Sequence, residues 1–192
     1  MKTNKKVLQI VSIIALFLAV VGISVGFALM STSLEIIGTA KVTPAEWKIL
    51  FTNATYSDNN TDAYEGKTPS LQDTSFSNYE VVLTKPGDHG TYTITVENQG
   101  DIDAKISEVV LGETLTYSAQ SQADEDIVKA NVSYSITWSD GTAIQTGDTL
   151  AAGASKNIIV DVLYDSDAEE IPQNEVGISG RTLTILYVQD NG

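Results

Sequence analysis

Residues 83–106 read LTKPGDHGTYTITVENQGDIDAKI, and this stretch decides the fold class. Its centre, TYTITVEN (91–98), places threonines and apolar residues at alternate positions, which is the period of a β-strand with one buried face. Turn-forming residues stand on both sides, at 85–88 before the strand and at 98–101 after it. The stretch therefore predicts successive strands joined by short turns.

The same pattern recurs along most of the chain. Segments rich in Val, Ile, Thr and Tyr predict strands at 34–42, 46–52, 78–84, 91–98, 104–111, 131–138, 155–164 and 181–188. A short helix is predicted over 121–131, where acidic residues precede a lysine. Residues 53–77 lack sustained alternation and predict a long polar loop. We expect residues 31–192 to form one all-β domain, a jelly-roll or immunoglobulin-like β-sandwich.

The N-terminal residues 1–30 differ from the rest. Lysines at positions 2, 5 and 6 precede an apolar run over 7–30. A basic start followed by an apolar run is typical of an export signal, and the small residues Gly26 and Ala28 predict cleavage after Ala28. An uncleaved transmembrane anchor is the alternative, because about 20 apolar residues suffice to cross a bilayer. Both interpretations predict an exported protein, at the cell surface or outside the cell.

Composition excludes several classes of protein. The net charge of −14 makes nucleic-acid binding unfavourable, since such a surface repels phosphate groups. The chain has no cysteine, which excludes disulfides and thiolate metal sites. It has a single histidine, His89, so a zinc hydrolase of the HExxH type is excluded as well. We expect His89 to belong to the turn before 91–98, and we predict no catalytic residue and no enzyme.

Two further groups of residues carry predictions. Carboxylates cluster just after the strand at 155–164 and could supply oxygen ligands to calcium, the one cofactor that the sequence suggests; they are Asp165, Asp167, Glu169 and Glu170. The alternative is that they are solvated surface charges. Trp47 and Trp138 lie on predicted strands with apolar neighbours, so both are expected in the core.

Four segments together resemble a known group of exported proteins: GFALMSTSLEIIGTAKV (26–42), KPGDHGTYTITVENQGDIDAKI (85–106), TGDTLAAGASKNIIVDVLYD (146–165) and RTLTILYVQ (181–189). They are similar to Gram-positive surface proteins with a SipW-dependent type of signal peptide, the TasA and camelysin group. The resemblance implies a jelly-roll-like domain and fibres in which an N-terminal strand, freed by cleavage, completes the sheet of the next subunit. The corresponding donor would be residues 33–42, with Leu34, Ile36, Ala40 and Val42 filling the partner's groove.

Three functions remain as hypotheses. The leading one is a non-enzymatic surface protein, a fibre or biofilm-matrix subunit whose partner is a second copy of itself. The alternative is a membrane-tethered binding or adhesion module that contacts a cell-surface or matrix polymer through the loop at 53–77 or through its strand edges. A surface hydrolase that uses the acidic clusters is the third, although the peptidase activity described for camelysin has no recognisable motif in this chain. If the apolar run is not cleaved, the strand at 34–42 must pair within its own domain.

Overall fold

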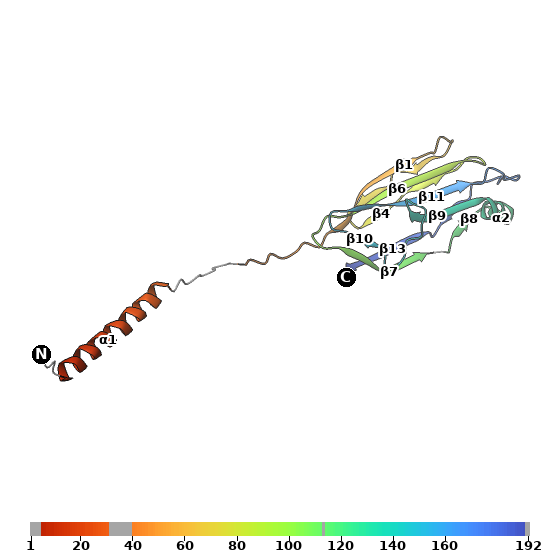
Figure 1. Ribbon diagram of the computed structural model, residues 1–192. Coiled ribbons are helices and arrows are strands. Elements are labelled where there is room, and N and C mark those ends of the chain that lie inside the picture. The colour runs from red at the N-terminus through yellow and green to blue at the C-terminus, as the bar shows by residue number, and fades with distance from the viewer. Residues whose placement is uncertain (1–4, 31–39, 113, 191–192) are drawn as a thin grey trace. The chain divides into compact units, whose positions relative to one another are not determined.

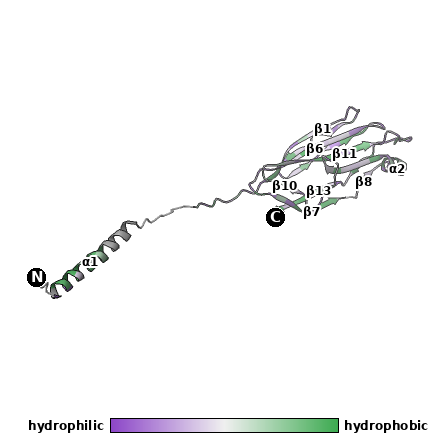
Figure 2. Cartoon of the chain, viewed as in Figure 1, coloured by the Kyte–Doolittle hydropathy of each residue, from purple (hydrophilic) through white to green (hydrophobic). Residues whose placement is uncertain are grey.

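The computed structural model of the chain describes residues 5–30, 40–112 and 114–190, without the side chains of residues 6 and 22–30. The chain divides into two compact units, residues 1–43 and 44–192. The first contains α1 (Lys5–Met30). Figure 2 shows the described part of α1 as mostly hydrophobic, whereas the strands of the second unit mix hydrophobic and hydrophilic residues.

Among the residues that the structure describes, no helix combines the length and the apolar character needed to cross a bilayer. Gly26 and Ala28, the predicted cleavage pair, lie in the part of α1 whose side chains are not described.

The second unit is an all-β domain built on two antiparallel sheets (Figure 1). The larger sheet has the order β1 (Ile49–Ser57), β6 (His89–Asn98), β11 (Ser155–Tyr164) and β9 (Val132–Trp138). The smaller sheet has the order β10 (Thr149–Leu150), β7 (Ala104–Gly112) and β13 (Thr182–Gln189).

Short elements complete the domain at its edges and at one end. Three two-stranded ribbons pair β2 (Tyr64–Lys67) with β5 (Glu80–Val82), β3 (Ser70–Gln72) with β4 (Ser75–Ser77), and β8 (Thr116–Ser118) with β12 (Gly177–Ser179). The helix α2 (Gln122–Asn131) comes after β8, and the side chain of Ser121 caps its N-terminus.

One core lies between the two sheets. Every second residue of β6 is buried, so Tyr92, Ile94 and Val96 point to one side of the larger sheet. They belong to the same buried cluster as Ala104 and Ile106 of β7, in the smaller sheet. Each sheet alone would leave an apolar face in water, so this shared core is what joins them.

Several predicted elements are confirmed. The helix predicted over 121–131 is α2, and the strands predicted at 104–111, 131–138, 155–164 and 181–188 agree with β7, β9, β11 and β13 to within one residue at each end. These segments have long alternating stretches, and β11 is hydrogen-bonded to a neighbouring strand on each side.

The long polar loop predicted over 53–77 is wrong. Residue 53 lies inside β1, which continues to Ser57, and β2, β3 and β4 occupy much of residues 64–77. A β-bulge between Phe51 and Asn53 explains part of the error, because the inward-facing residues are Ile49 and Phe51 before it but Ala54 and Tyr56 after it. Because the inward-facing residues are odd-numbered before the bulge and even-numbered after it, the sequence of β1 does not show one continuous alternation. The strands β2, β3 and β4 have only three or four residues, which is too short for an alternation to be recognised.

The strand predicted at 34–42 lies mostly outside the described residues, which exclude Leu34 and Ile36. Its described end, residues 40–42, has no regular secondary structure. Ala40 is exposed there, and Val42 is 94% exposed. The next predicted strand, at 46–52, begins later than expected, at Ile49.

Candidate functional site

One edge of the smaller sheet is open. Its order ends at β13, which pairs with β7 on one side and with no other strand in the described part of the chain. An edge strand presents unpaired N–H and C=O groups to which a further strand can be added. Along β13, Leu183, Ile185 and Tyr187 pack against the core, whereas Thr184 and Leu186 between them are exposed. The edge therefore has a regular inward and outward face.

A cavity of about 750 Å³ lies along this edge and reaches between the two sheets. We call it the β13 groove. Its apolar lining comes from both sheets and from β4: Ile49, Phe51, Phe76, Ile94, Val96, Ile136, Ile158, Val160, Leu183, Ile185 and Tyr187. Cavities of this size and character are typical binding sites, and here the groove is continuous with an unpaired backbone edge. The arrangement suits an extended peptide segment that brings alternate apolar side chains.

The groove is lined by few charged side chains, and these lie toward its two ends. Of the residues that line it, only Asp73 and Arg181 are charged. Arg181 is the only arginine of the chain, and its Nε is buried without a hydrogen-bond partner among the described residues. A buried, unpaired N–H is unfavourable, so this donor is suited to an acceptor that a bound group would bring.

Two tyrosines lie near the Arg181 end of the groove. The hydroxyl of Tyr79, which lines the groove, is hydrogen-bonded to that of Tyr134. Burial raises the pKa of Tyr134 most, the bond to Tyr79 raises it further, and nearby Arg181 acts in the opposite direction. The Tyr134 hydroxyl therefore stays protonated, and the guanidinium of Arg181 is the charge at this end.

Trp47 lines the other end of the groove, where the chain enters the domain. The carbonyls of Glu46 and Lys48 accept hydrogen bonds from the backbone of Asp101 and Gln99, in the turn after β6. Trp47 is 44% exposed, so the prediction of a core position is wrong for it, whereas Trp138 is buried as predicted. Trp47 precedes β1, in a segment without regular secondary structure, and it lines the groove instead of entering the core.

His89 is the first residue of β6, not part of the turn as predicted. Its Nε2 lies 2.6 Å from Oδ1 of Asp161 on the neighbouring β11, and the Thr91 hydroxyl donates to the same oxygen at 2.8 Å. A Ser-His-Asp arrangement needs a hydroxyl that donates to the imidazole and a carboxylate on its other nitrogen. Here the hydroxyl and the imidazole share one carboxylate oxygen, which is the geometry of a cross-strand polar cluster.

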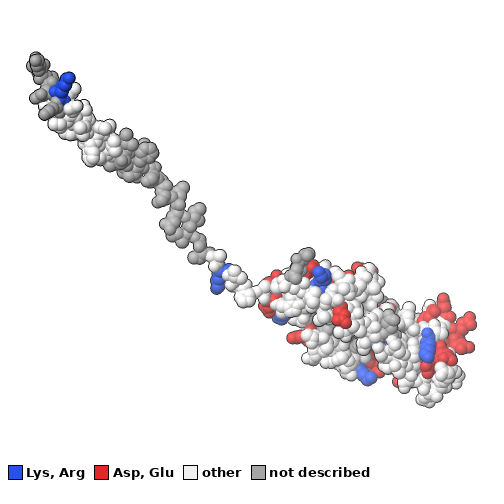
Figure 3. Space-filling view, turned by 90° about the horizontal axis from the view of Figure 1, so that it is seen from below, with Lys and Arg blue, Asp and Glu red and all other residues white. Residues whose placement is uncertain are grey.

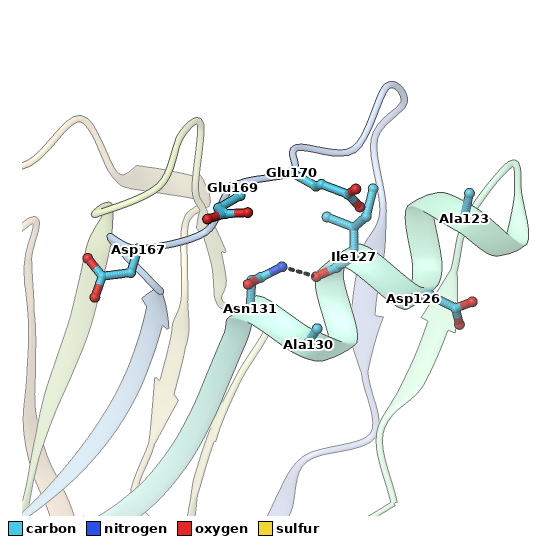
Figure 4. Close-up of a pocket in the computed structure, with 8 residues that line it drawn as sticks. All are labelled: Ala123, Asp126, Ile127, Ala130, Asn131, Asp167, Glu169 and Glu170. Atoms are coloured by element: carbon cyan, nitrogen blue, oxygen red, sulfur yellow. Dashed lines mark hydrogen bonds between the residues drawn. The ribbon is translucent and has the colours of Figure 1, made fainter.

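The predicted calcium ligands occupy the loop after β11, at an end of the domain where acidic side chains gather (Figure 3). Asp167, Glu169 and Glu170 line a second cavity, of about 500 Å³, beside α2. Figure 4 shows their carboxylates pointing in different directions. Asp165 instead closes its own turn, because its Oδ1 accepts from the backbone of Asp167 at 2.9 Å. Within the described residues, no three His, Cys, Asp or Glu side chains are grouped to hold a metal ion.

The sequence did not reveal the two buried carboxylates that the described residues of the domain contain. Asp88 has no exposed surface. Its Oδ2 accepts from the backbone and hydroxyl of Thr84 and from the backbone of Lys85, at 2.6, 2.7 and 3.1 Å, and its Oδ1 accepts from the backbone of Asp62 at 3.2 Å. Burial acts to raise the pKa of Asp88, but these hydrogen bonds outweigh it and lower the pKa below its usual value.

Asp124, in the first turn of α2, is the second buried carboxylate and joins the helix to the loop after β11. It accepts from the side chain of Asn174 at 2.9 Å, from the backbone of Gln173 at 2.7 Å and from the Ser121 hydroxyl at 2.9 Å, and these bonds lower its pKa, that from Asn174 most. The spacing of Ser121 and Asp124 is a helix-start signal that the sequence shows. Its partners in the loop after β11 are about 50 residues away and could not be predicted.

Comparison with known proteins adds no relative: no protein family, no curated protein and no solved structure matches this chain. The functional proposal therefore rests on the groove and on the sequence.

Proposed function

We propose that the protein is a non-enzymatic, exported surface protein that assembles into fibres or a matrix by strand addition. In this proposal residues 33–42 of one copy enter the β13 groove of the next. The observation that carries it is the coincidence of an unpaired strand edge with an apolar groove between the sheets. Either feature alone is common, whereas the two together are what an added strand requires.

The donor segment matches the groove in pattern. Leu34, Ile36, Ala40 and Val42 alternate with other residues, so they fall on one face of an extended strand. Burying each of the larger side chains contributes about 1.5–3 kcal/mol, and the backbone gains hydrogen bonds along the eight residues of β13. The described part of the segment supports donation to a second copy, because Val42 is exposed and forms no strand in its own chain.

The proposal also includes a jelly-roll-like topology for the domain and a location outside the cytoplasm. Two antiparallel sheets around one core are consistent with a jelly-roll-like sandwich that lacks one strand at the β13 edge. The apolar N-terminal run would act as the export signal, and cleavage after Ala28 would free the donor strand. If the run is retained, the domain is a membrane-tethered module instead. The intact mass of the protein from its native cells distinguishes the two.

A pair of matched variants tests strand addition. Ile36→Asp places a charge on the face that enters the groove, and Ile37→Asp places the same charge on the opposite face of the strand. We expect Ile36→Asp to abolish assembly of the mature protein, seen by negative-stain microscopy and sedimentation, and Ile37→Asp to retain it. Equal assembly by both variants would contradict the proposal.

A further inference from the structure

The β13 groove is electrostatically unequal along its length. At the end where β13 begins stands Arg181, the only cation among its lining residues. β13 then runs toward the end where the chain enters the domain, since Gln189 lies opposite Ala104 and the Asp190 backbone donates to the Asp103 carbonyl.

Carboxylates predominate at this second end. Asp73 lines the groove and its carbonyl accepts from the backbone of Phe51. The Asp101 carboxylate accepts from the backbone of Glu46, and the Asp103 carboxylate from that of Ala152. The acidic residues here are Glu46, Asp73, Glu97, Asp101, Asp103 and Asp190, against Lys48, Lys105 and Lys156, of which Lys105 is paired with Asp190 and Lys156 lies over the ring of Trp138. The groove thus has a positive end at Arg181 and a negative end near Gln189.

The donor segment carries the complementary polarity. Between residues 31 and 45 the only charged side chains are Glu35, near its start, and Lys41, near its end. Six residues of extended chain separate them by about 20 Å, comparable with the length of the eight-residue β13. A strand parallel to β13 would bring Glu35 to the Arg181 end and Lys41 to the acidic end. An antiparallel strand would place Lys41 beside Arg181 and Glu35 among carboxylates.

We propose that these charges fix the direction of assembly: residues 33–42 of a second copy add to β13 in parallel, with Glu35 at the Arg181 end of the groove. This inference rests on the proposed strand addition and specifies its geometry. In this arrangement Leu34 and Ile36 enter the groove, and Glu35 between them points to the outer face of the sheet. Arg181 lies on the groove side of β13, in phase with Leu183 and Ile185. The attraction between Glu35 and Arg181 therefore acts across the edge of the added strand and not through a direct ion pair. Opposite charges at both ends favour one direction and disfavour the other.

The absence of cysteine allows the direction to be tested by cross-linking. Thr39→Cys marks the outer face of the donor, and Thr182→Cys and Leu186→Cys mark the two ends of the exposed face of β13. If donor residues 35 and 39 lie beside 182 and 186, a parallel strand joins Thr39→Cys to Leu186→Cys. The antiparallel arrangement about the same centre joins it to Thr182→Cys. Each protein has one cysteine, so a heterodimer can form only between two molecules.

We expect a mixture of full-length mature Thr39→Cys and Leu186→Cys proteins to give disulfide-linked heterodimers at least tenfold faster than a mixture with Thr182→Cys. Peptide mass spectrometry then identifies the linked pair. Preferential linkage to Thr182→Cys would overturn the direction while leaving strand addition intact. Linkage to neither, under conditions where the wild-type protein assembles, would overturn both.

Charge reversal tests the cause of the direction. Arg181→Glu should slow assembly at low salt, and Glu35→Lys in the donor should restore it in the double variant, because the attractive pair is re-formed with opposite signs. Lys129→Glu, on α2 and outside the residues that line the groove, is the control for the change in net charge, and urea denaturation of this variant measures separately the effect of losing its pair with Glu125. Wild-type assembly rates in Arg181→Glu would overturn the role of the charges.

Discussion

Two regions of the domain differ in how their buried polar groups are hydrogen-bonded: the turn around Asp88, which we call the Asp88 corner, and the β13 groove. At the corner, four donors converge on one fully buried carboxylate and fasten the segment around Asp62 to the turn before β6. At the groove, the Nε of Arg181 is buried without a partner among the described residues, beside an unpaired strand edge. Native proteins satisfy nearly all buried polar groups, so the Asp88 carboxylate is complete, whereas the Arg181 Nε is a donor that a partner could satisfy. The hydroxyls of Tyr56, Tyr92 and Tyr164 are also buried without a partner among the described residues, so it is the open edge and the apolar groove beside Arg181 that distinguish this region.

Of the substitutions considered, Asp88→Asn in the Asp88 corner should have the largest effect on the stability of the folded domain. In Asp88→Asn one carboxylate oxygen becomes an NH₂ group that faces donors, so we expect the free energy of unfolding to fall by about 2–3 kcal/mol. Urea denaturation measures it. Thr91→Val, which removes a more exposed hydrogen bond to Asp161, is a control and should cost less.

The same carboxylate predicts a dependence on pH. The pKa of Asp88 is lowered in the folded state, so its stabilisation is present above the unfolded pKa of about 4 and is lost as the pH falls through the folded value. The difference in stability between wild type and Asp88→Asn should therefore shrink below about pH 4. A difference that stays constant from pH 6 to pH 2 would contradict this account.

A smaller and more local effect is expected at α2. Asp124→Asn weakens the bonds from Ser121, Gln173 and Asn174, so hydrogen exchange should increase in α2 and in the loop after β11 while β6 and β7 remain protected. Uniform loss of protection through the whole domain would show that the helix is not a separate local unit.

The cross-strand pair of His89 and Asp161 should contribute less again. Both side chains are about one-third exposed, and pairs of this kind are worth about 0.2–1 kcal/mol. A double-mutant cycle with His89→Gln and Asp161→Asn at pH 5.5 measures the coupling. A coupling above 2 kcal/mol would mean that this polar cluster matters to the fold far more than its exposure indicates.

The smallest effect on the stability of the domain is expected for a substitution of Arg181, in the β13 groove. Arg181→Met removes a buried, unpaired donor and keeps most of the side-chain volume, so the stability of the monomer should stay the same or rise. A loss comparable with that of Asp88→Asn would mean that Arg181 is already satisfied in the monomer and that the contrast between the two regions is wrong.

The sequence predicted the all-β class and most strands because β6, β11 and β13 each keep a regular alternation; β7 was predicted from its content of Val, Ile and Leu although its inward face changes at Ser107. The prediction failed at β1, where the bulge after Phe51 exchanges the two faces, and in the ribbons at 64–77, which are too short to show a period. The strand at 34–42 could be predicted from its own alternation, and its role as a donor is what the resemblance to the TasA and camelysin group implies. The groove could not be predicted, because Ile49, Phe76 and Leu183 come together only through the order of the strands.

Hydrogen exchange of β13 tests the central claim most directly. If the edge of β13 accepts a strand from a second copy, amides of residues 182–189 that exchange in the monomer should become protected on assembly, at least tenfold, together with those of 33–42 in the donor. Assembly that leaves exchange in β13 unchanged, with protection gained at another edge such as β9 or β10, would contradict strand addition at the β13 groove.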